Sequence, residues 1–177
     1  MTESEIISLI GEDGFEKAFG AIVDNYSEKL YWHVRHMVGS HEDADDLLQE
    51  IFIKVWTALP SFKGEARLYT WLWRIATNES LNFLRRQRLR SVLSFKSLSA
   101  GDDVCALDPY FNGDEAQALL MKAVSALPPK QKAVFLMRYF SEMKYEDISE
   151  ILKTSVGSLK ASYHIAEQKV RAELQKK

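Results

Sequence analysis

The sequence predicts an all-α fold made of two small helical domains joined by a flexible linker. Apolar residues recur at steps of three and four along most of the 177 residues, as they do in helices with one buried face. No segment shows the alternation that marks a strand. Between about Ser91 and Gly113 the periodicity gives way to Ser, Gly, Asp, Asn and Pro, which favour turns. We therefore expect domains over residues 1–90 and 114–177, with residues 91–113 as the linker.

The N-terminal domain is expected to hold two long helices before residue 60. Apolar residues keep the helical period over residues 15–38, and Gly39 ends this run. Ser40, with Asp43 three residues later, is a capping-box-like start for the next helix. The same period then continues to Pro60. A third helix is predicted from about residue 68 to residue 89, and its last turns are basic.

The C-terminal domain is predicted to contain four helices. The first covers about residues 114–126, and the Pro128-Pro129 pair suits the start of a second that reaches about Tyr139. Two more follow at about residues 145–152 and 156–174, separated by a three-residue turn. A short helix, a tight turn and a longer helix are the order of a helix-turn-helix.

Charge is segregated along the chain, although the net charge is only -2. Residues 1–60 carry 12 Asp/Glu against 4 Lys/Arg, whereas residues 61–100 carry 2 against 8. Residues 101–125 are again acidic, with 5 against 1, and residues 126–177 are basic, with 6 against 10. Basic faces neutralise phosphates, and acidic blocks weaken indiscriminate binding to a duplex. The pattern favours a nucleic-acid partner that is bound locally.

Few residues suggest redox, metal or membrane chemistry. The single cysteine, Cys105, can form no internal disulfide and anchors no cysteine-rich zinc site, and His33 and His36 have no evident third ligand. The first residues lack the positive leader of a signal peptide, and no apolar run approaches the roughly 20 residues that span a bilayer. We expect a cytoplasmic protein without membrane insertion, bound metal or cofactor.

An aromatic and basic segment from Phe62 to Arg90 is the first candidate site. Trp71 and Trp73, with Tyr69 and Phe62 nearby, can stack on unpaired bases, and the arginines that follow can pair with phosphates. The alternative is that these rings belong to the core and the arginines to a solvated helix face. The Phe62-Lys63-Gly64 loop favours the site over the core alternative. A loop that places an aromatic ring beside a flexible glycine can form a pocket without disrupting the helix on either side.

The acidic start of the second helix is the next candidate. Carboxylates over residues 42–46 stabilise a helix N-terminus through its dipole, which explains some of them. Gln49, Glu50 and Lys54 form a polar face opposite an apolar one. We interpret this face as a surface for a partner, with an ordinary solvated surface as the alternative.

The predicted helix-turn-helix is the third candidate. Small and polar residues near the start of its second helix let that helix enter a major groove. These exposed or groove-facing residues are Ser158, Lys160, Ala161, Ser162, His164 and Gln168. Arg138 and Lys144 precede the motif and are placed to hold phosphates. A plain helical hairpin with a wet, basic side is the alternative.

Together these residues resemble the extracytoplasmic-function (ECF) class of bacterial sigma factors, which belongs to the sigma-70 family. The run from Asp43 to Trp56 is similar to the region-two helix that docks on the clamp helices of RNA polymerase. The run from Trp71 to Asn78 resembles the neighbouring promoter-melting helix, and the chain from Ala126 onwards resembles region four. The match covers most of the chain, with both modules in the family's order around a linker.

The resemblance implies roles for individual residues. It implies that the loop and helix around Phe62, Lys63, Gly64 and Asn78 capture a flipped base of the minus-ten element. It implies that the same DNA strand is supported by Lys54, Trp71, Arg85, Arg86 and Arg88. For the polymerase clamp it implies Asp46, Gln49 and Glu50. For minus-thirty-five DNA it implies Arg138, Lys144, Ser155, Ser158, Lys160, Ala161, Ser162, His164 and Ile165. The linker is expected to thread towards the polymerase active centre and RNA exit path.

This sequence also departs from the family pattern. Many relatives carry arginines at the positions of Ser162 and Ile165, and a Ser or Thr helix cap at the position of Lys144. The minus-thirty-five sequence that these relatives prefer is therefore not expected to apply to this chain.

The resemblance implies an alternative-sigma initiation factor that performs no catalysis. Its implied partners are core RNA polymerase, promoter DNA and an anti-sigma factor. An autonomous helix-turn-helix regulator is the main alternative. A metal-dependent enzyme built on Asp43, Asp45 and Asp46 is disfavoured, because consecutive carboxylates point around a helix rather than converge.

Overall fold

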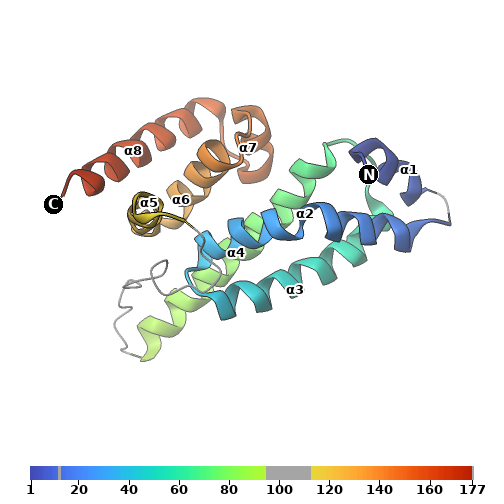
Figure 1. Cartoon of the computed structure of the whole chain (residues 1–177), viewed down its shortest axis with the longest axis horizontal. Coiled ribbons are helices and arrows are strands. Elements are labelled where there is room, and N and C mark those ends of the chain that lie inside the picture. Colours follow the sequence, from blue (N-terminus) through green and yellow to red (C-terminus); the bar gives the residue numbers. More distant parts are fainter. Residues whose placement is uncertain (12, 95–112, 177) are drawn as a thin grey trace.

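The computed structural model describes residues 1–11, 13–94 and 113–176, and within them every regular element is helical (Figure 1). This confirms the all-α prediction. The N-terminal bundle consists of α1 (Glu3–Ile10), α2 (Phe15–Val38), α3 (His41–Ala58) and α4 (Leu68–Ser94). The C-terminal bundle consists of α5 (Glu115–Ser125), α6 (Pro129–Phe135), α7 (Tyr145–Leu152) and α8 (Val156–Gln175). None of the described helices is long and apolar enough to cross a membrane.

The predicted signals set the boundary between α2 and α3. Gly39 adopts a left-handed conformation with φ of 92°, and its N–H donates to the carbonyl of Arg35. Ser40 then accepts a hydrogen bond from the N–H of Asp43 at 3.1 Å, as the capping pattern predicts. A 3-10 turn, Leu59–Ser61, follows α3.

Two parts of the N-terminal bundle differ from the sequence prediction. The short helix α1 was not expected, although Thr2 and Glu5 form a capping box that could have indicated it. Helix α4 continues to Ser94, five residues past its predicted end and into the predicted linker. Residues 95–112 of that linker, including Cys105, lie outside the described residues.

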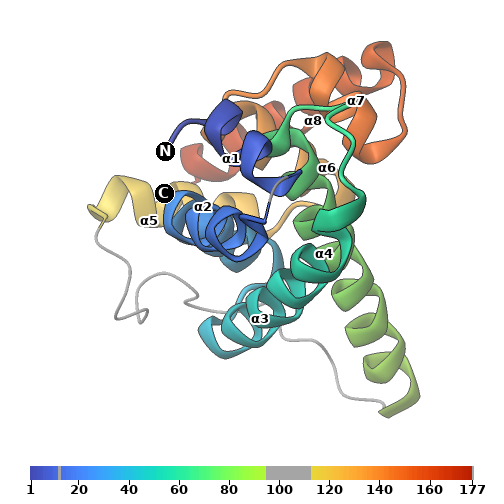
Figure 2. The same ribbon diagram turned by 90° about the vertical axis from the view of Figure 1, so that its right-hand side faces the viewer.

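The core of the N-terminal bundle is made by the apolar stripes of α2, α3 and α4. The fully or nearly fully buried members of this core include Ile22, Leu30, Val34, Leu47, Ile51, Val55, Leu72 and Trp73. Burial of one large apolar side chain contributes about 1.5–3 kcal/mol to the stability of the fold. Figure 2 shows the last turns of α4 projecting beyond the other helices.

The C-terminal bundle contains the predicted helix-turn-helix. Pro129 is the first residue of α6, and a π-helical turn, Leu136–Phe140, ends that helix. Lys153 ends α7 in a left-handed conformation with φ of 53°, and Ser155 caps α8 by accepting from the N–H of Ser158 at 3.3 Å. The tight turn therefore comes from one strained residue and one cap.

The two bundles pack against each other, with α6 and α7 lying against α2 and α4 (Figures 1 and 2). The Lys132 ammonium of α6 lies 3.5 Å from the carbonyl of Met37 at the end of α2. The Thr77 hydroxyl of α4 donates to the sulfur of Met137 at 3.9 Å. The sequence had left the relative arrangement of the two domains open.

Candidate nucleic-acid and protein interfaces

A cavity of about 500 Å³ lies where the 3-10 turn leads into α4. The Phe62 ring lies 5.1 Å from the Trp71 ring at an angle of 51°, so the two rings form one corner of the cavity. Gly64, with φ of 71°, turns the loop beside them. The lining residues are Ala58, Ser61, Phe62, Lys63, Glu65, Ala66, Trp71, Arg74, Ile75 and Asn78. The structure thus brings together Phe62, Lys63, Trp71 and Asn78, for which the family resemblance implied a common site.

The aromatic residues of this segment divide between cavity and core. Trp71 and Phe62 are partly exposed, whereas Trp73 is only 1% exposed. Trp73 stacks on Tyr69 at 4.0 Å, inside the bundle. The interpretation of Trp73 as a base-stacking residue is therefore wrong, and the half-buried Tyr69 does not line the cavity. Residues two apart on a helix lie on nearly opposite faces, so Trp71 and Trp73 cannot serve the same site.

Lys54 lies outside the cavity and is paired within the protein. Its ammonium lies 2.5 Å from a carboxylate oxygen of Glu79, a residue that is 9% exposed. Arg85 and Arg88 are exposed on the last turns of α4. Arg86 is exposed too, but it faces a different cavity.

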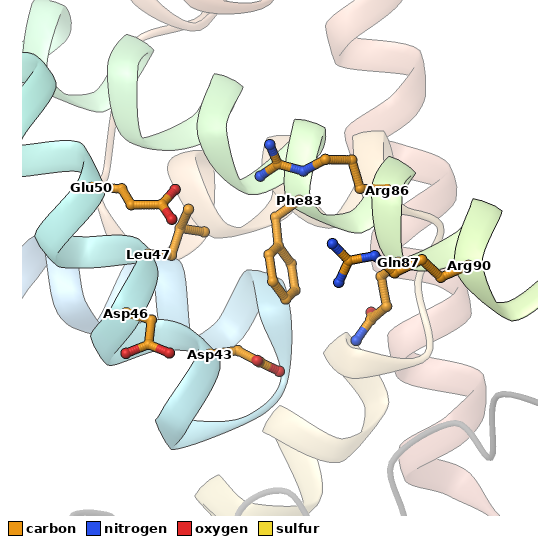
Figure 3. A pocket seen from close by; sticks show the side chains of 8 residues that line it. All are labelled: Asp43, Asp46, Leu47, Glu50, Phe83, Arg86, Gln87 and Arg90. Atoms are coloured by element: carbon orange, nitrogen blue, oxygen red, sulfur yellow. The ribbon is translucent and has the colours of Figure 1, made fainter.

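That second cavity, of about 400 Å³, lies between the start of α3 and the end of α4 (Figure 3). Figure 3 shows Asp46 and Glu50 on one wall and Arg86 and Arg90 on the other, with the Phe83 ring between them. The remaining lining residues are Asp43, Leu47 and Gln87. Within the described residues no ion pair joins the two walls. The cavity therefore offers separate acidic and basic surfaces to a ligand.

An apolar groove of about 580 Å³ runs along α2 and α3. Ile53 is 66% exposed and Trp56 is 42% exposed, and the Phe19 ring meets the Trp56 ring edge-on at 4.9 Å. The lining residues are Phe19, Val23, Asp45, Leu48, Gln49, Phe52, Ile53 and Trp56. Exposed apolar side chains in a groove are typical of a protein interface. Ile53 was not among the residues predicted for a site. The available signal was that this isoleucine lies outside the apolar stripe that α3 buries.

The three neighbouring aspartates of α3 diverge in the structure. Asp43 and Asp46 line the charged cavity, whereas Asp45 lines the apolar groove. No group of three His, Cys, Asp or Glu residues within the described ranges could hold a metal ion. His33 is buried, with 5% of its surface exposed, and a hydrogen bond of 2.9 Å joins its Nε2 to the Thr77 hydroxyl. Burial lowers the pKa of His33 to about 3, so this side chain is a neutral member of the core.

The second helix of the helix-turn-helix presents one exposed face. Its exposed members from the predicted set are Ser155, Ser158, Lys160, Ala161, His164 and Ile165, while Ser162 is partly buried. Ile165 is 43% exposed and is the one large apolar side chain among these exposed residues. These residues lie on the early turns of α8, where a groove-binding helix makes its contacts.

The two basic residues ahead of the motif differ in their surroundings. Arg138 donates to the carbonyl of Met143 at 3.0 Å, and its guanidinium lies 4.8 Å from the centre of the Tyr145 ring. Arg138 therefore supports the connection from α6 to α7. Lys144 occupies the position before α7 and is exposed, and no side-chain bond caps that helix.

Comparisons with known proteins agree on both bundles. The family model described as Sigma-70 region 2 matches residues 22–90, and the model described as Sigma-70, region 4 matches residues 117–170. The ECF RNA polymerase sigma factor SigW of Bacillus subtilis is 29% identical over 171 residues, which are 91% of each chain. The ECF RNA polymerase sigma-E factor of Escherichia coli K12 is 28% identical over 184 residues, covering 99% of this chain and 95% of the relative.

Solved structures show the same fold. The sigma factor RpoE, in its complex with the anti-sigma factor NepR from Bartonella quintana, superposes with a TM-score of 0.74 at 24% identity, over 90% of this chain and 98% of that one. CnrH, in its complex with the cytosolic domain of CnrY, superposes with a TM-score of 0.67 at 20% identity, over 97% and 94%.

Proposed function

The chain belongs to the ECF class of the sigma-70 family, and from this premise we propose how its parts divide the work of initiation. It is an alternative sigma factor that directs promoter-specific initiation of transcription. In our proposal the N-terminal bundle docks on core RNA polymerase and opens the minus-ten element. The C-terminal bundle reads the minus-thirty-five element as duplex.

The cavity beside Phe62 and Trp71 is the observation that carries the proposal. The cavity is large enough to admit one extruded base, and it offers ring faces for stacking and the Asn78 amide for hydrogen bonds to a base edge. Unstacking a base costs a few kcal/mol, which a preformed pocket offsets. We assign Lys63 and Arg74 to the phosphates around that base, with Gly64 shaping the loop. Arg85 and Arg88 extend this basic path along α4.

Polymerase docking is assigned to both sides of α3. The acidic wall with Asp46 and Glu50 provides charged contacts, and Gln49 marks the rim of the apolar groove. We extend the predicted set by Ile53 and Trp56, because exposed apolar and aromatic side chains are the usual anchors of protein interfaces. Arg86, which faces the acidic wall, is assigned here rather than to DNA.

The exposed early turns of α8 are assigned to the minus-thirty-five element. Ser155, Ser158, Lys160, Ala161, His164 and Ile165 form this surface, with Ser162 at its edge and Lys144 at the phosphates. Arg138 is assigned a supporting role beside Tyr145. We place the end of the N-terminal domain after Ser94, because α4 continues to that residue.

Further partners follow from the relatives. One similar solved structure is the complex of the sigma factor RpoE with the anti-sigma factor NepR, and another is the complex of CnrH with the cytosolic domain of CnrY. We propose that an anti-sigma factor also binds this chain. We further propose that the chain acts in the cytoplasm and by binding energy alone, without covalent chemistry.

Run-off transcription with purified core polymerase tests the proposal. Promoter templates come from DNA upstream of transcripts that overexpression induces, and a known sigma factor with its own template serves as the positive control. The expected result is a discrete product that appears only with holoenzyme. No promoter-directed product, while the control works, would contradict the proposal. Gel shifts separate the rival regulator, which binds its operator tightly without polymerase.

A further inference from the structure

Helix α4, which carries the proposed melting surface, begins without a capping side chain of its own. Arg67 is the residue before its first turn, since the Arg67 carbonyl accepts from the N–H of Trp71 at 3.0 Å. A guanidinium contains no hydrogen-bond acceptor. The first N–H groups of a helix have no partner inside that helix. The N–H groups at the start of α4 are therefore left to water or to an acceptor from another part of the chain.

Glu3 of α1 supplies this acceptor from 65 residues away. One of its carboxylate oxygens accepts from the N–H of Leu68 at 2.6 Å, and the other lies 4.0 Å from the Arg67 guanidinium. Leu68 is fully buried in this arrangement, so its N–H is shielded from solvent while it donates to Glu3. The negative charge also stabilises the positive end of the helix dipole. Figures 1 and 2 show α1 beside the beginning of α4.

Helix α1 is held firmly enough to present that carboxylate. Thr2 accepts from the N–H of Glu5 at 3.3 Å, and the Glu5 carboxylate accepts from the N–H of Thr2 at 2.6 Å. Ile6 is fully buried in the core of the bundle. Because the backbone of Glu3 lies between these fixed points, bonding to Leu68 costs side-chain rotamer entropy but little further backbone entropy.

The same contact fixes one end of the loop that lines the cavity beside Phe62 and Trp71. Lys63, Glu65 and Ala66 of this loop line the cavity. Within the described residues no hydrogen bond involves residues 63–66, so the loop is held at its ends. The Phe62 N–H donates to the Leu59 carbonyl at 3.1 Å at one end, and Glu3 holds the other.

We propose that Glu3 is a positioning residue for promoter opening, acting as an N-cap supplied to α4 by a different helix. This inference rests on the proposed function of the cavity and adds a residue that never touches DNA. Glu3 sets where α4 begins and thereby where the loop with Lys63 must lie. Removing it frays the first turn of α4 and widens the set of loop conformations.

Promoter opening by reconstituted holoenzyme tests this role. The probe is a fluorescent base analogue in the minus-ten element, and any affinity tag is kept at the C-terminus. Glu3→Ala should lower the fraction of opened promoter about fivefold to tenfold, the effect of losing a good helix cap. Its affinity for core polymerase, measured separately, should stay within twofold of the unmodified chain. Glu16→Ala, an exposed carboxylate in the first turn of α2, is the matched control and should open the promoter normally.

Rescue separates capping from general destabilisation. Serine is a good N-cap and alanine a poor one. In the Glu3→Ala background, Arg67→Ser should therefore recover most of the opening, whereas Arg67→Ala should not. Normal opening by Glu3→Ala, equal behaviour of the two double variants, or a parallel loss of polymerase affinity would each overturn the inference. An unmodified chain that directs no transcription would instead overturn the proposed function.

Discussion

The ammonium of Lys54 lies 2.5 Å from a carboxylate oxygen of Glu79, and this ion pair joins α3 to α4. The Glu79 side chain is 12% exposed, whereas that of Lys54 is 54% exposed. The pair links the helix assigned to polymerase docking with the helix assigned to melting. Lys54 therefore has its charge compensated before any DNA phosphate arrives.

Glu79→Gln should strengthen the attraction of the N-terminal bundle for promoter DNA. The substitution leaves Lys54 without its carboxylate and adds one net positive charge beside the proposed path of the melted strand. The slope of log affinity against log salt should steepen by up to about 0.7, the value for one phosphate contact on a single strand. Fluorescence anisotropy of holoenzyme on a pre-opened promoter fragment measures the slope. Glu28→Gln, on an exposed part of α2, is the control, and an equal slope for both variants would refute the prediction.

Trp71→Ala should impair opening rather than docking. The ring forms one wall of the cavity, and stacking on an aromatic side chain contributes about 1–3 kcal/mol per base. Opened promoter should therefore fall about tenfold, as followed by permanganate reactivity of minus-ten thymines. Leu89→Ala, which truncates an exposed residue further along α4, is the control. Unchanged reactivity with Trp71→Ala would remove this ring from the site.

Ile53→Asp should weaken binding to core polymerase by more than tenfold. The side chain is 66% exposed on the rim of the apolar groove, so the substitution places a charge in the interface and leaves the core intact. The melting temperature should change little. Leu174→Asp, at an exposed position near the end of α8, serves as the matched control. A pull-down titration in which both variants bind equally would exclude the groove as a docking surface.

Ala161→Asp should reduce transcription from promoters that depend on the minus-thirty-five element. Ala161 lies on the exposed early turns of α8, where a carboxylate would face DNA phosphates and base edges. The loss should exceed tenfold in run-off assays. Ala172→Asp makes the same substitution on an exposed position near the end of α8 and should retain activity. Equal losses for both would mean that charge alone, rather than the reading face, explains the effect.

His33 should make the fold sensitive to mild acid. Burial, reinforced by the nearby His36, lowers its pKa from 6.5 to about 3, so folding disfavours the protonated form. The stability that neutral His33 contributes is complete above pH 6.5 and is lost as the pH falls towards 3. The free energy of unfolding should decrease by up to about 1.4 kcal/mol per pH unit in this window. Denaturant melts at pH 7, 6 and 5 measure the trend, which His33→Gln should flatten and the exposed His164→Gln should leave intact.

The helices and their boundaries were predictable because their signals are local. Gly39 and Ser40 act through backbone conformation and a cap within three residues, and both function as the sequence indicates. Helix α1 carries the same kind of local signal, yet its eight residues are too few to show a clear period. The end of α4 was misplaced because Ser91 breaks the apolar pattern without breaking the helix.

The candidate site was only partly predictable, because the packing of the helices decides which side chains line the cavity. Trp71 and Trp73 look equivalent in the sequence, and only the direction in which α4 packs sends one to the cavity and the other to the core. The contact of Glu3 with Leu68 spans 65 residues and leaves no pattern at either end. The resemblance to sigma factors supplied the roles, and the helix geometry decides which side chains are available for them.

The position of Lys132 has a consequence for how the two bundles separate. This side chain is 8% exposed between them, burial lowers its pKa, and within the described residues no carboxylate pairs with it. A buried ammonium without a counter-ion lacks most of its hydration, which costs several kcal/mol. When the bundles separate, the Lys132 ammonium is hydrated again. The free energy gained by this hydration offsets part of the cost of exposing apolar surface to water. The buried Lys132 thus lowers the free energy needed to separate the bundles, and a large partner that binds the separated bundles has a smaller cost to offset.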